Sequence, residues 1–523
     1  MRERLIGIDA GGTMTKVALF DPLGNELGCE RRPNRMLFPK ANWTERDADA
    51  MWHATCEAIR NLMEKTNTAP EQIVAITPSG FGAGVFVVDR SGNPVRNGIV
   101  STDSRSSAII GEWAESGLIS DLPSQIQQQI WPGQTLALLS WFSRFEPETV
   151  ERTAHVLLCK DFLRMRLCGD VSTDPTDAGC AGVVDVNSGS VATGALEQLG
   201  LSAWINKLPP VRPSTEVVAG LSDAAAEQTG LLAGTPVARG VYDVVGCALS
   251  SGVATSNQLA VVAGTFSINS TLHSRPALNP LPTIQAAYPV AGTFLATSAT
   301  PTSASNLEWM CKTMLAAEGD RAIREGKSIY DVCNSLVDVA LRRDNDILFF
   351  PFLFGGPKGA PGGFLGLTAD NNLGDVMRAV YEGIVFAHKY DLETHLAGPD
   401  AATCDVVRLA GGPSRSDVWA QMFSDGLNLP VEIANGTEFG AKGAAMCGAV
   451  ASGLYPDVQT AIDKMVVVER RFDPDPTRVE AIEEKYGNYR DAVTSIGAIW
   501  NMQKLRRNTR PPVLVEDETN LAN

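Results

Sequence analysis

An aspartate, a glycine pair, two threonines and a lysine lie close together near the start of the chain. They are Asp9, Gly11, Gly12, Thr13, Thr15 and Lys16. An aspartate at the end of a buried strand can hold a hydrated Mg²⁺, and glycine N–H groups and threonine hydroxyls can approach phosphate oxygens closely. The same residues fit an ordinary β-hairpin with an aspartate at its turn, and taken alone they favour that hairpin.

A second segment near mid-chain repeats this pattern. Gly264 and Thr265 stand between an apolar run, 259–263, and a second strand-like run. One such hairpin is unremarkable, but two in one chain point to two halves that each open with the same element. The pair predicts a clamp that holds a triphosphate from both sides.

Asp243 lies in the segment ARGVYDVVGCALSSGV, among small apolar residues. Burial there would raise its pKa toward a value suited to taking a proton from a hydroxyl group. The alternative is an N-cap or first-turn aspartate that stabilises the helix dipole, and the local sequence favours this alternative.

Two further segments carry polar groups in turns. Asp103 and Arg105 follow a predicted strand, 98–100, where an acceptor and a donor could bind the hydroxyls of a polyol. The alternative for this pair is a surface ion pair of little energetic worth. The segment GGPSRS, 411–416, could admit a flat ligand or an anion at a helix N-terminus, or it could be a tight strand–helix loop.

The elements that must position these residues alternate along the chain. Strands are expected at 5–8, 17–20 and 73–76, the first two joined by the glycine-rich turn. Helices are expected at 49–65, 306–317, 373–396 and 416–427. This alternation with glycine-rich turns predicts the α/β class.

Composition excludes several classes of protein. The 523 residues are 44% hydrophobic, with 44 Lys and Arg against 60 Asp and Glu, so disorder and a surface-wide nucleic-acid binder are both excluded. No window of about 18 apolar residues predicts a membrane helix. The ten cysteines lack C-x-x-C spacing, and no signal peptide is evident, which predicts a reduced, cytoplasmic protein. The tripeptide Gly326-Lys327-Ser328 resembles the end of the P-loop motif GxxxxGK[ST]. The first glycine of that motif would be at position 321, where this chain has Arg321, so the segment does not match a P-loop.

Nine segments, in order along the chain, resemble those of the FGGY carbohydrate kinases. They are GIDAGGTMTK (7–16), TPSGFGAG (77–84), STDSR (101–105), CKDFLRMRLCGD (159–170), AGTPVARGVYDVVGCAL (233–249), VVAGTFS (261–267), RAVYEGIVFA (378–387), GGPSRSDVWAQMFSD (411–425) and EFGAKGAA (438–445). Each is weak alone, but the ordered set is specific and covers most of residues 5–450. FFPFLFG (349–355) and GGPSRSDVWAQM make the L-xylulose kinase branch the most similar.

The resemblance implies a duplicated actin-like, ribonuclease-H-like α/β ATPase fold, with two domains and a cleft between them. Residues 1–255 and 256–505 are the expected domains, and 506–523 a tail. ATP and Mg²⁺ are the implied cofactors and a small sugar the partner, with no nucleic acid or membrane, while a homodimer stays open.

The resemblance also implies a role for each candidate residue. Asp243 would be the catalytic base, and Asp9 would position Mg²⁺ and phosphate, the two carboxylates holding the metal through water. The ATP site would comprise Gly11, Gly12, Thr13, Thr15, Lys16, Gly264, Thr265, Gly411, Gly412 and Ser416. The sugar site would comprise Gly80, Phe81, Asp103, Arg105 and Asp243.

The chain departs from the family pattern at three places. The commoner D-xylulose kinases carry Gln-Met-His where this chain has Phe81-Gly82-Ala83. The usual tryptophan of the sugar loop is Ser101, and the serine after Gly-Thr is Phe266. These departures put D-xylulose in doubt as the substrate and leave the phosphoryl chemistry intact.

The leading hypothesis is therefore an ATP-dependent kinase of a ketopentose such as L-xylulose. A kinase of erythritol-type polyols is the alternative within the same class. A catalytically silent sugar sensor and an actin-like ATPase or chaperone are alternatives from other classes. The two hairpins with Asp9 and Asp243 argue against a silent sensor, and the sugar loop argues against a chaperone.

Overall fold

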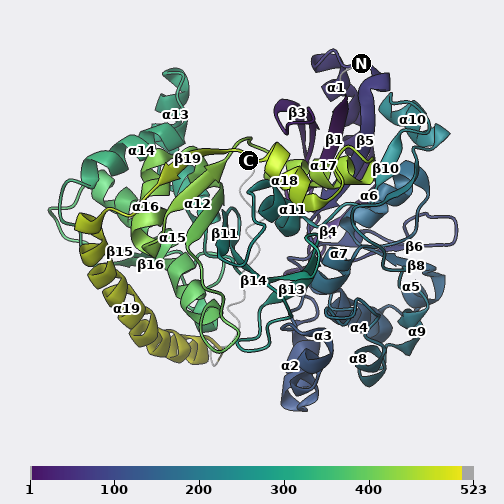
Figure 1. Ribbon diagram of the computed structural model, residues 1–523. Helices are drawn as coiled ribbons and strands as arrows, with labels where there is room; N and C mark the ends of the chain where they lie inside the picture. Colours follow the sequence, from purple (N-terminus) through teal and green to yellow (C-terminus); the bar gives the residue numbers. More distant parts are fainter. Residues whose placement is uncertain (1–2, 509–523) are drawn as a thin grey trace, which may run out of the picture.

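Two twisted sheets, each covered by its own helices, form the two halves of the molecule (Figure 1). The structure is a computed structural model that describes residues 3–508. The predicted tail, 506–523, therefore lies outside the described residues from position 509 onward, and residues 506–508 end helix α19 (Pro476–Asn508). No helix in the described range is both long and apolar enough to cross a membrane.

The N-terminal sheet has the strand order β3-β2-β1-β5-β10-β9. Its strands are β1 (Arg4–Ala10), β2 (Met14–Phe20), β3 (Glu26–Pro33), β5 (Ile73–Gly80), β9 (Val217–Gly220) and β10 (Pro236–Ala238). The predicted hairpin is present, with β1 antiparallel to β2, and β1 also pairs in parallel with β5.

The C-terminal sheet repeats this arrangement in the order β13-β14-β12-β11-β17-β18-β19. Its strands are β11 (Gln258–Ala263), β12 (Ser267–His273), β13 (Ile284–Tyr288), β14 (Thr293–Thr300), β17 (Val406–Gly411), β18 (Val431–Ala434) and β19 (Val468–Phe472). Strand β11 is antiparallel to β12 and parallel to β17, as β1 is to β2 and β5. The second glycine–threonine hairpin thus occupies the position equivalent to the first.

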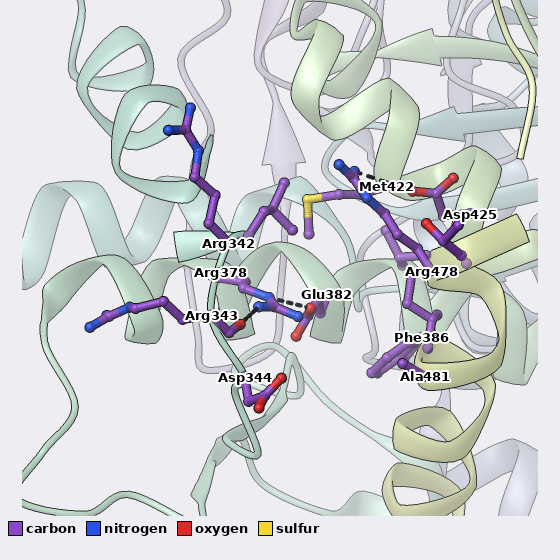
Figure 2. A pocket seen from close by; sticks show the side chains of 15 residues that line it. Arg342, Arg343, Asp344, Arg378, Glu382, Phe386, Met422, Asp425, Arg478 and Ala481 are labelled. Atoms are coloured by element: carbon purple, nitrogen blue, oxygen red, sulfur yellow. Dashed lines mark hydrogen bonds and ion pairs between the residues drawn. The ribbon is translucent and has the colours of Figure 1, made fainter. Parts of the chain in front are cut away.

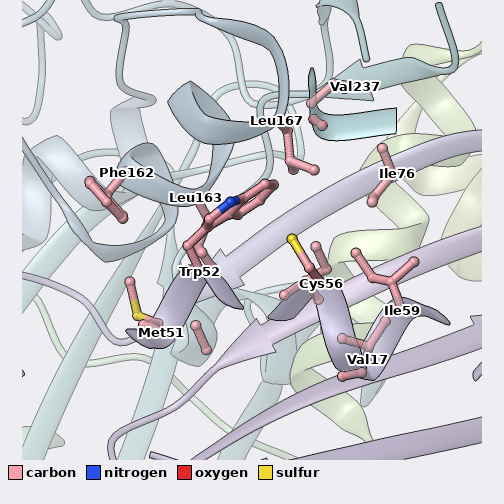
Figure 3. Close-up of a cluster of buried hydrophobic side chains, with 14 of the residues drawn as sticks. Val17, Met51, Trp52, Cys56, Ile59, Ile76, Phe162, Leu163, Leu167 and Val237 are labelled. Atoms are coloured by element: carbon pink, nitrogen blue, oxygen red, sulfur yellow. The ribbon is translucent and has the colours of Figure 1, made fainter. Parts of the chain in front are cut away.

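Helix α1 (Ala48–Lys65) shows how the apolar pattern builds the first core. Met51, Trp52, Cys56 and Ile59 lie on its buried face and belong to one cluster with residues of the sheet such as Val17 (Figure 3). Helix α6 (Cys159–Cys168) contributes Phe162, Leu163 and Leu167 to the same cluster. These contacts fix the strands whose ends carry the candidate residues.

Helix α17 (Phe439–Ala451) joins the two halves. It comes from the C-terminal half, yet it packs on β1, on β5 and on α11 (Asp243–Ser250) of the N-terminal half. Glycines allow this close approach: a Cβ on Gly443 would lie 2.1 Å from the carbonyl oxygen of Gly246, and one on Gly7 would lie 1.9 Å from that of Ala441. The two halves therefore pack tightly against each other where α17 contacts α11 and β1.

The predicted helices occur with small shifts and one break. Helix α15 is Leu373–His395 and α16 is Asp417–Leu427, with Ser416 as its N-cap. The single helix predicted at 306–317 is wrong, because α12 (Ala304–Thr313) ends before α13 (Ala316–Arg324) begins. The break lets Leu315 turn into the core while Met314 stays exposed. Helix α14 (Ile329–Ala340) follows and packs on α15.

Candidate active site

The ends of neighbouring chain segments bring Asp9 and Asp243 to one edge of the N-terminal sheet. Ala10 at the end of β1 pairs with Gly80 at the end of β5, and Gly80 pairs in turn with Tyr242. Asp243 follows Tyr242 as the first residue of α11. Asp9 on β1 and the start of α11 at Asp243 therefore lie on either side of the end of β5, at the same edge of the sheet.

Asp9 occupies a confined position between both halves of the molecule. Its Oδ1 atom is buried and has no hydrogen-bond partner among the described residues. Burial raises the pKa of its carboxyl group, the charge of Lys16 on the facing strand lowers it, and the charge of Glu438 raises it further. An unpartnered buried carboxylate oxygen is an incomplete arrangement for a folded protein, and a ligand or cation would complete it.

The position and the surroundings of Asp243 fit both alternatives that the sequence left open. It lies in the first turn of α11, where a negative charge interacts favourably with the positive end of the helix dipole. Its Oδ1 accepts a hydrogen bond from the Val244 N–H (2.8 Å). Burial, reinforced by the charge of Asp9, raises the pKa of Asp243 from 3.8 to about 7. A carboxylate with this pKa is suited to accept a proton near neutral pH.

A pocket of about 710 Å³ extends from Asp9 across the C-terminal half. Seven predicted residues line it: Asp9, Lys16, Gly264, Thr265, Gly411, Gly412 and Ser416. Its volume lies within the range of known ligand pockets, about 300–1,000 Å³. The structure thus brings both hairpins and the 411–416 turn to a single cavity.

The remaining residues of the first hairpin do not line this pocket. The Thr15 hydroxyl donates to Asn34 Oδ1 (2.9 Å), and the Asn34 amide donates to the Gly11 carbonyl (3.1 Å). Arg46 donates to the Gly12 carbonyl. Thr15 therefore stabilises the turn through Asn34, while the side chain of Thr13 is exposed in the turn.

Several residues that line the pocket were not predicted as site residues. Tyr330, Asp331 and Asn334 of α14 line the pocket, as do Tyr381 and Trp419, whose rings stack at 4.3 Å. Asn334 Oδ1 accepts from the Tyr381 hydroxyl (2.9 Å) and the Ser416 hydroxyl (2.8 Å). Helical periodicity could have placed α14, but which of its faces meets the pocket depends on tertiary packing.

The predicted sugar-loop residues are buried and paired with each other. Arg105 binds both oxygens of Asp103 (2.9 Å each), and Asp103 Oδ2 also accepts from the Thr44 N–H (2.6 Å). The Arg105 guanidinium lies 4.0 Å from the Trp43 ring and 4.9 Å from the Trp141 ring. The alternative of a surface ion pair is therefore wrong, and neither side chain lines the 710 Å³ pocket.

Gly80 and Phe81 lie at the end of β5, beside Asp243. Gly80 pairs with Tyr242 there, but the Phe81 side chain points into the first core and lies under the Arg46 guanidinium at 5.2 Å. Neither residue lines the 710 Å³ pocket. A contact of Phe81 with a ligand would therefore have to come from its backbone.

A buried charge network, also missed from the sequence, supports the loop that follows β5. Lys160 lies 2.6 Å from Asp161, 2.8 Å from Asp174 and 3.8 Å from Asp177, and all four side chains are inaccessible to solvent. Asp177 accepts a hydrogen bond from the Ala83 N–H (3.2 Å), and Ala83 has a positive φ of 57°. The network therefore anchors a loop whose conformation a non-glycine residue rarely adopts.

A second, smaller hollow of about 250 Å³ lies among α14, α15, α16 and α19 (Figure 2). Most of its charged residues are paired: Arg378 with Glu382 (2.7 Å), Arg343 with Asp375, and Arg478 with Asp425 (3.7 Å). It shares no lining residue with the larger pocket, and no predicted site residue lines it.

Gly440, at the start of α17, controls the space around Asp9. A Cβ at Gly440 would lie 2.7 Å from Asp9 Oδ2, so an alanine must displace the carboxylate. Because a side chain rather than backbone yields, we expect Gly440→Ala to fold but to lose up to about 100-fold in kcat/KM, the scale on which a misplaced group lowers a rate. Steady-state kinetics test this, with Gly487→Ala as control, since a Cβ there meets open space. Unchanged kinetics in Gly440→Ala would contradict a role for Asp9.

Comparison with known proteins gives a consistent result over most of the chain. The N-terminal domain of the FGGY family of carbohydrate kinases matches residues 4–250, and its C-terminal domain matches residues 259–452. The relatives include a probable L-xylulose kinase of Pasteurella multocida, 32% identical over 94% of this chain and 99% of the relative. An L-xylulose/3-keto-L-gulonate kinase of Escherichia coli is also 32% identical, over 95% and 98%.

A more distant relative and a solved structure are also carbohydrate kinases. An erythritol kinase of Brucella abortus is 27% identical over 96% of this chain and 98% of the relative. The crystal structure of xylulose kinase from Rhodospirillum rubrum superposes with a TM-score of 0.82 at 22% identity, covering 95% of this chain and 100% of that one. The fold is thus the duplicated actin-like fold of these kinases. The chain belongs to the FGGY family of carbohydrate kinases and is an ATP-dependent sugar phosphotransferase.

Proposed function

We propose that this enzyme phosphorylates a ketopentose such as L-xylulose, with Asp243 as the general base. The observation that carries the assignment of the base is the position of Asp243: it stands beside Asp9, and its pKa is raised to about 7. The substrate assignment is supported by the two relatives at 32% identity, which are named as kinases of L-xylulose.

In this proposal the nucleotide occupies the 710 Å³ pocket. The stacked rings of Tyr381 and Trp419 lie at the end occupied by the nucleoside, and Gly264 and Thr265 approach the phosphates. Lys16 supplies positive charge beside Asp9, although in this structure it pairs with Glu438 (3.0 Å). Because the transition state of phosphoryl transfer is loose, these residues act by positioning and by stabilising charge.

The carboxylates of Asp9 and Asp243 fit a magnesium ion held through water. Asp9 Oδ1 is unpartnered and buried, and Mg²⁺ usually takes only one or two carboxylates together with water and phosphate oxygens. Bound there, Mg²⁺ would neutralise charge on the phosphates. The described residues contain no group of three or more His, Cys, Asp or Glu that could hold a metal.

The sugar hydroxyl would donate its proton to Asp243 as it attacks the terminal phosphate. Asp103 and Arg105 would act indirectly, because their side chains are buried in the loop beside Trp43 and Trp141. We propose that this paired, rigid loop shapes the sugar end of the cleft. The backbone of Gly80 and Phe81 would form the adjacent wall.

A polyol of the erythritol type is the second candidate substrate, favoured by the erythritol kinase relative. The test is a screen of L-xylulose, D-xylulose, L-ribulose, 3-keto-L-gulonate and erythritol with the purified enzyme, coupled to ADP release. The highest kcat/KM with L-xylulose would support the ketopentose proposal. A preference for erythritol would replace it, and the absence of turnover with every compound would contradict both.

The second hairpin gives a separate prediction. Thr265 lines the pocket, and its carbonyl accepts a hydrogen bond from Ser305 (2.9 Å), so its backbone is held while its hydroxyl can contact ATP. Thr265→Val removes the hydroxyl at nearly constant shape. We expect KM for ATP to rise about 10-fold, the scale of one lost hydrogen bond, with KM for the sugar changing less.

Initial-rate measurements with each substrate varied in turn provide this test. The control is Thr494→Val, because Thr494 is exposed on α19 and does not line the pocket. This variant should leave both KM values unchanged. An unaltered KM for ATP in Thr265→Val would count against the second hairpin as a phosphate site.

A further inference from the structure

Two of the ten cysteines face each other directly behind the nucleotide pocket. All ten are free thiols in the structure. Cys311 of α12 and Cys333 of α14 are buried, and their sulfur atoms are 3.8 Å apart, in hydrogen-bond contact. A disulfide bond is about 2.05 Å long, so the two sulfurs lie less than 2 Å beyond bonding distance.

Both cysteines stand on helices that form the wall of the pocket. Leu307 and Glu308 line it one turn before Cys311 on α12. On α14, Tyr330 lines it one turn before Cys333, and Asn334 is the next residue. Any movement that brings the two sulfurs together therefore moves residues of the nucleotide site.

Asn334 is the residue through which such a movement would act. It accepts hydrogen bonds from Ser416, the N-cap of α16, and from Tyr381, whose ring stacks on Trp419. Tyr381 and Trp419 belong to one apolar cluster with Cys311 and Cys333. Displacing Asn334 would break both hydrogen bonds and loosen the end of the pocket that we assign to the nucleoside.

We propose that Cys311 and Cys333 are a reversible oxidation site, and that their disulfide weakens ATP binding. The proposal rests on the nucleotide site assigned above. The oxidant is a peroxide, and the reductant that restores the thiols is a dithiol. The inferred activity is thus regulated through the pocket wall, without a change at Asp9 or Asp243.

The oxidation proceeds in two balanced steps. The thiolate of Cys311 attacks one oxygen of hydrogen peroxide, the O–O bond breaks, and the products are a sulfenic acid and, after protonation, water. The sulfur of Cys333 then attacks the Cys311 sulfur, the S–O bond breaks, and the hydroxyl leaves with the Cys333 proton as a second water. Two thiols lose two electrons, and the peroxide is reduced to two waters.

The local electrostatics distinguish the two thiols. The hydrogen bond from Cys333 lowers the pKa of Cys311, although burial opposes this. The same bond, together with burial, raises the pKa of Cys333. Cys311 is thus the better nucleophile toward peroxide, and Cys333 is placed to resolve the sulfenic acid.

The test treats the purified wild-type enzyme with hydrogen peroxide and removes the excess. Peptide mapping under non-reducing conditions is expected to find a Cys311–Cys333 cross-link. Calorimetry with ATP alone, without sugar, is expected to show affinity at least about 5-fold weaker, the lower end of typical coupling between sites. Dithiothreitol should restore the original affinity.

Single variants separate this site from general oxidative damage. Cys311→Ser and Cys333→Ser should bind ATP as the untreated enzyme does and lose sensitivity to peroxide. Cys404→Ser, which removes a partly exposed cysteine elsewhere, should keep the full effect. If one serine variant fails to fold, the other variant and the wild-type cross-link still decide the question.

Three results would overturn the inference. They are no Cys311–Cys333 cross-link after peroxide, a cross-link with unchanged ATP affinity, and a wild-type loss of ATP affinity after peroxide in both serine variants. Failure of the proposed sugar substrate is distinguishable, because ATP affinity and the cross-link are measured without any sugar. An enzyme that binds ATP reversibly under peroxide control but ignores L-xylulose would retain this inference and lose the substrate assignment.

Discussion

Asp243→Asn is expected to lower kcat at least about 100-fold, the usual scale for a lost general base, while the protein stays folded. The carboxylate stands at the start of α11, and its pKa is raised to about 7 by burial and by the neighbouring Asp9. Asparagine keeps the shape and accepts the same backbone hydrogen bond but cannot take the proton from the sugar hydroxyl.

The same substitution, which lowers activity, should raise the stability of the unliganded protein at high pH. A raised pKa means that the fold favours the neutral carboxyl group, so the contribution of Asp243 to stability is full below its ordinary pKa of 3.8. That contribution is lost as the pH rises through about 7. At pH 8 the unliganded wild type carries an unfavourable buried charge that the asparagine variant lacks. We therefore expect Asp243→Asn to unfold at a higher temperature than wild type at pH 8, and the difference to shrink toward pH 4.

Three measurements check this prediction together. They are kcat with sugar and ATP, the pH dependence of kcat/KM in the wild type, and thermal unfolding of both proteins at pH 4 and pH 8. In the wild type kcat/KM should fall as the pH decreases through about 7, because the base becomes protonated. Asp223→Asn is the matched control, since Asp223 is also a first-turn aspartate but is exposed on α10 (Asp223–Thr229). Near wild-type turnover in Asp243→Asn would refute the assignment of the base.

Local patterns predicted the two glycine–threonine hairpins, because the information that specifies a hairpin is local. Gly264 and Thr265 follow an apolar strand directly, and the turn between antiparallel strands needs only neighbouring residues. The repetition of the hairpin then predicted the duplicated architecture, which the equivalent pairings of β1 and β11 confirm. The roles assigned to the individual hairpin residues stay predictions.

The sugar loop shows why other parts could not be predicted. Two charged residues two positions apart, Asp103 and Arg105, suggest exposure in any local analysis. Their burial depends on Trp43 and Trp141, whose rings the fold brings from distant positions in the sequence to within 5 Å of the guanidinium. The wall of the pocket made by α14 escaped prediction for the same reason, because Asn334 acquires its partners Tyr381 and Ser416 only in the folded protein.

Replacing Lys160 by methionine is expected to lower the free energy of unfolding strongly. Its ammonium group is fully buried and lies within 4 Å of three carboxylates, those of Asp161, Asp174 and Asp177. These carboxylates raise the pKa of Lys160 against the effect of burial, which lowers it. Lys160→Met fills a similar volume but leaves buried negative charge uncompensated, and removing one partner of a buried ion pair typically costs about 3–5 kcal/mol.

Urea unfolding of Lys160→Met should therefore show a large loss of stability, and Lys312→Met provides the comparison. Lys312 makes an equally short ion pair with Glu308 (2.6 Å), but both side chains are exposed, so its loss should cost less than about 1 kcal/mol. The substitution and the shortest ion-pair distance are the same, but Lys160 is buried among three carboxylates while Lys312 is exposed beside one. Since Asp177 also holds the Ala83 N–H, Lys160→Met should loosen the loop after β5 as well, and activity should fall at urea concentrations where the wild type is unaffected. Equal stability of the two variants would mean that the buried network is neutralised by protonation, and that the loop beside Asp243 is held by packing alone.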